Sequence, residues 1–98
     1  MGNRDDRYDL IKPMLSEGKI NSFNDIFKYI PKTIVAKDLG KKVDRFTELM
    51  HNVEEFTVEE LFTIANFCSL DEVQMLNLML NEYRSAKGKI PRAKMLIK

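Results

Sequence analysis

Apolar residues recur every three or four positions along much of the chain, which is the pattern of helices that bury one face. The clearest pair of such stretches flanks Gly40. The apolar positions before it are Val35, Ala36 and Leu39, and those after it are Val43, Phe46, Leu49 and Met50. Glycine can take the left-handed backbone conformation that ends one helix and redirects the chain. The pattern therefore predicts two helices joined by a tight turn at Gly40.

Two shorter helices are expected before this pair. Ser22 is a suitable N-cap residue, and Pro31 ends the helix that it opens. Further upstream, Pro13 fits the first turn of a helix but not its interior. We therefore expect a short helix from about Lys12 to just before Gly18. This N-terminal helix is expected to cover one side of the core.

Two helices are expected after the pair, each marked by a serine or threonine with a glutamate three residues later, which is the spacing of a capping box. The two boxes are Thr57–Glu60 and Ser69–Glu72. The last helix carries two apolar stripes, one made of Val73, Leu76, Leu80 and Tyr83 and the other of Met75, Leu78 and Met79. We assign the first stripe to the core. The second is expected to be an apolar surface that is covered either in an isologous dimer or by the N-terminal segment.

Charge is distributed unevenly along the chain, although the net charge is only +1. Residues 31–52 carry five basic and three acidic side chains, residues 53–83 carry seven acidic side chains and no Lys or Arg, and residues 84–98 carry six basic side chains and no acidic one. These shifts divide the chain into an N-terminal segment (1–19), a helical domain (20–83) and a basic flexible tail (84–98). The tail is interpreted as solvated, as an arm along DNA, or as a partner for the acidic helices of a neighbouring subunit.

The same residues resemble the phage-repressor and Cro-like (XRE-type) helix-turn-helix family. The matching positions are Ala36, Gly40, Phe46, Leu49, Thr57-Val58, Leu61, Ile64-Ala65 and Leu70. The resemblance covers residues 32–70 and extends over about 20–83. Departures at Lys32, Lys41, Met50, Asn52 and Phe56 mark a divergent member. The resemblance implies an all-α, compact five-helix lambda-repressor-like domain, to which this chain adds a short N-terminal helix and a basic C-terminal tail.

A helix-turn-helix places its second helix in the major groove of double-stranded DNA. The outward residues of that helix, predicted to read bases, are Lys42, Asp44, Arg45, Thr47 and Glu48. Arg45 is the principal candidate, because a guanidinium can pair with guanine O6 and N7. The flanking residues predicted to contact phosphate are Lys32, Thr33, Lys41 and Asn52. The predicted dimer interface is Met75, Leu78 and Met79 on the last helix.

Other classes of function find little support in the sequence. The chain has one histidine, His51, and one cysteine, Cys68, and it lacks a catalytic triad, a phosphate-binding loop and a metal-ligand spacing. We therefore expect no enzyme activity, cofactor, metal or small-molecule substrate. No apolar run approaches the roughly 20 residues of a membrane helix, and a cytoplasmic protein is expected. The alternative function is a helix-turn-helix fold used as a protein interaction module, without specific DNA binding.

Overall fold

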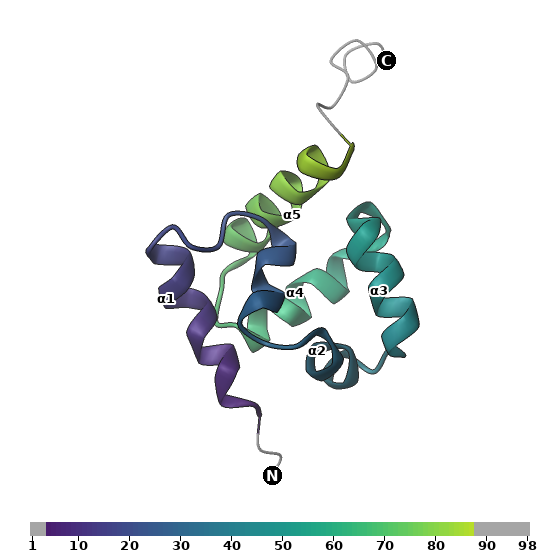
Figure 1. Cartoon of the computed structure of the whole chain (residues 1–98), viewed down its shortest axis with the longest axis horizontal. Coiled ribbons are helices and arrows are strands. Elements are labelled where there is room, and N and C mark those ends of the chain that lie inside the picture. The colour runs from purple at the N-terminus through teal and green to yellow at the C-terminus, as the bar shows by residue number, and fades with distance from the viewer. Residues whose placement is uncertain (1–3, 88–98) are drawn as a thin grey trace.

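The local sequence signals produce five α-helices and three short 3-10 helices over residues 4–87, which are the residues that the computed structural model describes (Figure 1). In chain order they are η1 (Asp6–Leu10), α1 (Ile11–Ser16), η2 (Phe23–Lys28), α2 (Lys32–Leu39), α3 (Val43–His51), η3 (Val53–Glu55), α4 (Val58–Phe67) and α5 (Glu72–Lys87). No strand occurs within this described part of the chain. The predicted all-α class is confirmed.

The helices are arranged with α1 at one edge of the molecule, α3 at the opposite edge and α4 between them (Figure 1). α2 contacts both α3 and α4, while α5 packs against α4, η2 and η3. The C-terminal end of α5 projects beyond the other helices in the figure. This arrangement leaves the α2–α3 pair on the side of the molecule away from α1.

The core is built around aromatic side chains that meet edge to face. Phe23 packs against Phe27 and Phe56, and Phe46 packs against the same two rings, with centroid distances of 5.3–5.7 Å. Because Phe46 lies on α3, this cluster anchors α3 to η2 and to the residue after η3. Tyr8 and Ile11 are also buried. The N-terminal segment therefore covers the core, as predicted.

The turn at Gly40 is confirmed in detail. Gly40 has φ 80° and ψ 28°, which is the left-handed conformation. Its N–H donates to the Lys37 carbonyl at 3.0 Å, and the Lys41 N–H donates to the Ala36 carbonyl at 2.8 Å. This pair of hydrogen bonds is the Schellman arrangement that closes a helix. α2 therefore ends at Leu39, and the chain turns directly into α3.

The predicted helix starts are correct at two positions. Ser22 and Asp25 form a capping box at η2, although the helix that follows is a 3-10 helix and not an α-helix. Thr57 and Glu60 form the box at α4: the Glu60 N–H donates to Thr57 Oγ1, and the Thr57 N–H donates to a Glu60 carboxylate oxygen, both at 3.0 Å.

The second predicted capping box, Ser69–Glu72, is wrong. Ser69 has φ 61° and lies in the turn that follows α4. α5 is capped instead by Asp71 and Gln74: the Gln74 N–H donates to Asp71 Oδ1 at 2.8 Å, and the Asp71 N–H donates to Gln74 Oε1 at 3.0 Å. The sequence pattern therefore predicted this helix but placed its start two residues too early, because α5 begins at Glu72.

The two apolar stripes of α5 are largely exchanged relative to the prediction, although Leu80 is partly buried and Tyr83 packs against the core as predicted. Met75 and Leu78 are buried, and Met79 packs against the core, so they do not form an exposed interface. Val73 and Leu76, which we assigned to the core, are 66% and 38% exposed. The periodicity of an isolated helix defines its faces but not which face meets the body. That choice is made here by packing against α4, η2 and η3.

α5 also continues further than expected. It runs to Lys87, so residues 84–87, which we assigned to the tail, are helical. The predictions made for residues 88–98 lie outside the described residues.

Candidate functional site

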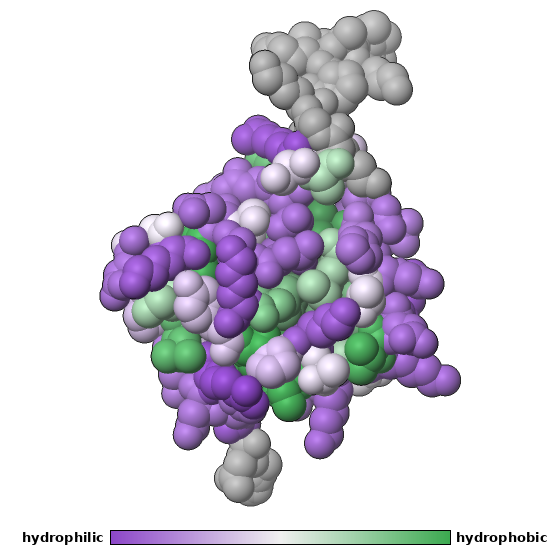
Figure 2. Space-filling view, viewed as in Figure 1, coloured by the Kyte–Doolittle hydropathy of each residue, from purple (hydrophilic) through white to green (hydrophobic). Residues whose placement is uncertain are grey.

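The α2–α3 unit has one buried face and one face directed to solvent. Val35 and Ala36 of α2 and Phe46 and Leu49 of α3 are buried. Val43, expected on the buried stripe, is 37% exposed at the start of α3. The edge of the molecule where α3 lies is mainly hydrophilic (Figure 2). This edge therefore presents polar side chains on a helix whose inner face is fixed by packing.

Four of the five residues predicted to read bases are exposed on this edge, namely Lys42, Asp44, Arg45 and Glu48. The fifth, Thr47, is partly buried, and its hydroxyl donates to the Val43 carbonyl at 2.9 Å. A hydroxyl engaged with the preceding turn of its own helix is a weaker candidate for base contact. The structure thus places the predicted set on α3 and at its N-cap, Lys42, with Thr47 at the margin of the exposed face.

Arg45 lies between two carboxylates. Its Nη1 is 3.1 Å from Glu48 Oε1, one turn along α3, and 3.6 Å from Glu55 Oε1 in η3. The Arg45 side chain is 50% exposed, so the guanidinium remains accessible. Glu55 was not among the predicted site residues. Its approach to Arg45 depends on the bend between α3 and η3, which helix periodicity does not reveal.

The residues predicted to contact phosphate differ in their surroundings. Thr33 is exposed and Lys32 is partly buried at the first turn of α2. Lys41 pairs with Glu60 of α4 at 2.5 Å, and both side chains are more than three-quarters buried. The Asn52 side-chain amide donates to the Glu48 carbonyl at 3.2 Å. A phosphate contact by Lys41 therefore requires the ion pair with Glu60 to open.

Lys37 is a further basic residue that the sequence reading missed. It is exposed and lies one helical turn after Thr33, so the two share a face of α2. The sequence could have identified it, because Lys37 stands three residues before Gly40 and therefore lies on the helix that was predicted to end there. It adds a positive charge to the outer side of α2.

Charge is divided across the unit. Residues 32–42 hold four lysines and one aspartate, for a net charge of +3. Residues 43–60 hold one arginine and six acidic residues, for a net charge of −5. The positive charge thus lies on α2 and the turn, while the end of α3, η3 and the start of α4 are acidic. An anionic ligand would be attracted to the first part and repelled by the second.

Burial and hydrogen bonding shift the pKa of two groups near this unit. Partial burial raises the pKa of Glu60, but hydrogen bonds from Lys41 and from the Thr57 backbone outweigh it, so the pKa of Glu60 is lowered. Burial raises the pKa of Tyr8, and the hydrogen bond from its hydroxyl to Asp38 Oδ2 at 2.7 Å raises it further. Tyr8 therefore stays protonated and ties the N-terminal segment to α2.

The cysteine, the acidic side chains and the helices of the described part of the chain are considered in turn. Burial raises the pKa of the Cys68 thiol to about 12, which suppresses the reactive thiolate. Within residues 4–87, no three His, Cys, Asp or Glu side chains gather as a metal site would require. In the same range, no helix has the length and apolar character that crossing a membrane demands.

Comparison of the chain with known protein families, with curated proteins and with solved structures finds no match.

Proposed function

We propose that this chain is a sequence-specific regulator that binds double-stranded DNA and reads the major groove with α3. The observation that carries the proposal is the pairing of the left-handed turn at Gly40 with an α3 whose inner face is buried and whose polar outer face is exposed. A helix held in this way can enter a groove without disturbing the core. The resemblance of residues 32–70 to the phage-repressor family supports the same function.

Arg45 is the main base-reading residue in this proposal. Its accessible guanidinium can pair with guanine O6 and N7 once it leaves Glu55. Glu48, on the same helix, can keep the guanidinium oriented through their contact at 3.1 Å. Asp44 and Lys42 lie at the start of α3. In this proposal the Asp44 carboxylate accepts a hydrogen bond from cytosine, and the Lys42 ammonium donates one to guanine.

Phosphate contacts fall on α2. Lys32 and Thr33 occupy its first turn, where backbone N–H groups and the helix dipole favour an anion. Lys37 extends the same basic side of α2 by one turn. These contacts orient the domain on the duplex without reading its sequence. The acidic stretch after α3 should face away from the phosphates.

The dimer that we proposed through the last helix is retained with different residues. Val73, Leu76 and Leu80 lie on the face of α5 turned away from the buried Met75 and Leu78, at heptad-like spacing. Two copies joined there by a two-fold axis would present two α3 helices to one duplex. Such dimers bind half-sites about one helical turn, roughly 34 Å, apart.

Selection from a library of random duplexes tests the proposal. We expect enrichment of a short motif repeated as an inverted pair, bound less tightly as salt rises because phosphate contacts release counterions. An unenriched library, with equal binding to all duplexes, would reject sequence-specific recognition. The interaction-module alternative would then remain, but without the Met75, Leu78 and Met79 surface on which it was based.

A further inference from the structure

Asn24, in the first turn of η2, connects three helical elements through two hydrogen bonds. Its side-chain Nδ2 donates to the Met50 carbonyl in the last turn of α3 at 3.0 Å. Its backbone N–H donates to Glu82 Oε1 of α5 at 2.8 Å. The end of α3 is thus joined to η2, and the start of η2 is joined to α5.

The carbonyl that receives the Asn24 amide is one that α3 cannot satisfy by itself. The last four carbonyls of an α-helix have no partner within the helix. Those of Glu48 and Leu49 accept from the Asn52 N–H at 3.0 and 3.1 Å, but Asn52 follows α3 directly and moves with it. The Met50 carbonyl accepts from a residue 26 positions away in the chain. This bond therefore relates α3 to the body of the molecule.

The remaining attachments of α3 leave its tilt to be fixed by this end. α3 packs mainly against α2 and η3, which flank it in the chain. Near the middle of α3, the Phe46 ring meets Phe27 of η2 with a centroid distance of 5.5 Å. A ring contact fixes how closely α3 approaches η2 but allows rotation about the contact. The directional bond from Asn24 at the C-terminal end removes that freedom.

A small tilt of α3 would matter for base contacts. α3 has nine residues and is therefore about 13 Å long. A tilt of about 10° around its start moves its far end by about 2 Å. Hydrogen bonds form over a range of only about 0.5 Å in donor–acceptor distance. Phosphate contacts from α2 and base contacts from α3 can thus be made together only within a narrow range of angles between the two helices.

We propose that Asn24, held by Glu82, is a positioning residue that sets the tilt of α3 and thereby the bases that α3 reads. This inference rests on the DNA-reading function proposed above. Asn24 acts through α3 and not by contact with DNA, because it is partly buried and its amide nitrogen is directed at Met50. Its Oδ1 is also buried and accepts no hydrogen bond from another residue of the range 4–87.

Asn24→Leu tests the positioning role, because leucine keeps the branched shape, lacks the donor and retains the backbone N–H that meets Glu82. Residual dipolar couplings measured on the ¹⁵N-labelled full-length chain report the direction of each helix. We expect α3 to tilt by about 10° or more in the variant. The angle between α2 and α4 should stay as it is in the parent.

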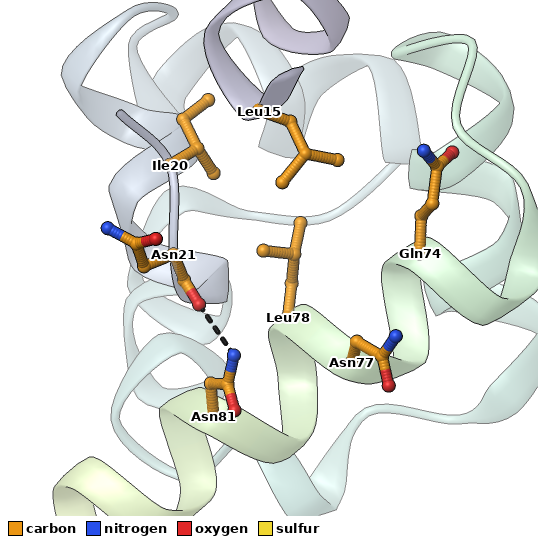
Figure 3. Close-up of a pocket in the computed structure, with 7 residues that line it drawn as sticks. All are labelled: Leu15, Ile20, Asn21, Gln74, Asn77, Leu78 and Asn81. Carbon is orange, nitrogen blue, oxygen red and sulfur yellow. Dashed lines mark hydrogen bonds between the residues drawn. The ribbon is translucent and has the colours of Figure 1, made fainter. Parts of the chain in front are cut away.

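Asn81→Leu is the matched control. Asn81 Nδ2 donates to the Asn21 carbonyl at 2.8 Å, which ties α5 to the segment before η2 without involving α3 (Figure 3). The substitution therefore removes the same kind of bond, from a side-chain amide to a backbone carbonyl. The direction of α3 in Asn81→Leu should match that in the parent.

A second readout separates positioning from a general loss of folded protein. It is the ratio of the affinities for the selected duplex and for a scrambled duplex of the same length. We expect Asn24→Leu to lower this ratio by at least about tenfold, because misplaced base contacts count as mismatches. The affinity for the scrambled duplex should not change, because the phosphate contacts of α2 remain. A loss of folded protein would lower both affinities by the same factor.

Two substitutions of Glu82 test the other hydrogen bond. Glu82→Gln keeps an oxygen that can accept from the Asn24 N–H, so the direction of α3 and the affinity ratio should be those of the parent. Glu82→Leu removes the acceptor and should lower the ratio. Equal behaviour of the two variants would exclude Glu82 from the positioning role.

An unchanged direction of α3 in Asn24→Leu, or an equal fall of both affinities, overturns the proposal. A parent chain that selects no motif rejects the proposed function and the reading role of Asn24 with it. The dipolar couplings judge the positioning of α3 in either case, because they are measured without DNA.

Discussion

Glu60 links two parts of the helix-turn-helix unit through a single carboxylate. One oxygen accepts from the Thr57 N–H and the other contacts Lys41 Nζ, so the same residue caps α4 and holds the turn after α2. Lys41 is one of the positions where the sequence departs from the phage-repressor pattern. Its pairing with Glu60 gives a physical reason for a lysine where an apolar residue is common.

Replacing Glu60 with Gln should lower stability in a pH-dependent way. Because the folded-state pKa of Glu60 is lowered, its charged form stabilises the fold above the ordinary pKa of 4.5, and that contribution is lost as the pH falls through the folded-state value. We expect the variant to lose about 1 kcal/mol in urea unfolding at pH 7. The difference from the parent should shrink as the pH is lowered below 4.5.

Glu59→Gln is the matched control, because Glu59 is the exposed neighbour of Glu60 in the first turn of α4. The Glu59→Gln variant should lose less stability in urea unfolding at pH 7 than the Glu60→Gln variant does. Equal losses in the two variants, with the same dependence on pH, would show that the Lys41 contact contributes nothing.

Glu55 is expected to restrain Arg45 in the absence of DNA. Changing Glu55 to Gln removes a carboxylate 3.6 Å from the guanidinium, which has to leave that carboxylate before it can pair with a base. The affinity for the selected duplex, measured by fluorescence anisotropy, should rise about fivefold at low salt, which corresponds to roughly 1 kcal/mol for a surface charge pair. Glu72→Gln, at the start of α5, makes the same charge change elsewhere. If the two variants bind equally, Glu55 does not oppose DNA binding.

At the level of the helices, the strongest sequence signals were local ones. The Gly40 turn and the caps at Ser22 and Thr57 were predictable because each depends on residues within five positions of one another. The Asp71–Gln74 cap was missed because serine and glutamate offered a competing pair two residues earlier. The helical class was therefore accessible from sequence, and small errors remained at the helix ends.

The side of α5 that faces the core was not predictable in the same way. Both stripes are apolar, so periodicity alone gave no reason to prefer Met75 over Val73. The choice depends on contacts with η2 and η3, which are distant in sequence. The contact between Glu55 and Arg45 was not predictable for the same reason, because it joins two separate elements, α3 and η3. The candidate site was thus predictable where it lies on one helix and was missed where a second element completes it.

Gly40→Ala should destabilise the fold by straining the turn. An added Cβ meets no atom within 4 Å, so the cost comes from the positive φ alone and should be about 1–2 kcal/mol. Gly18→Ala is a matched control, with φ 77° and equally open surroundings. Thermal unfolding should show similar losses for both. Only Gly40→Ala should also weaken binding of the selected duplex, and equal binding by the two variants would separate this turn from recognition.

The whole molecule combines the proposed DNA-reading edge with an apolar outer face on α5. For a chain of 11.5 kDa, light scattering at about 100 µM is expected to give twice that mass if Val73, Leu76 and Leu80 join two copies. The pair of changes Val73→Lys and Leu76→Lys should produce the monomer mass while the chain stays folded, because both side chains are exposed. Val58→Lys, at an exposed position of α4, should leave the dimer intact. A parent protein that is monomeric at this concentration would exclude this interface.

The most direct measurement of the central claim compares the motifs that the parent and the Arg45→Ala variant select from random duplexes. The account predicts that Arg45→Ala loses about 1–3 kcal/mol of affinity for the parent's motif and accepts any base at one position of each half-site. Lys12→Ala, on α1 at the edge opposite α3, should select the same motif as the parent. A motif unchanged in Arg45→Ala would show that α3 does not read DNA in the way proposed here.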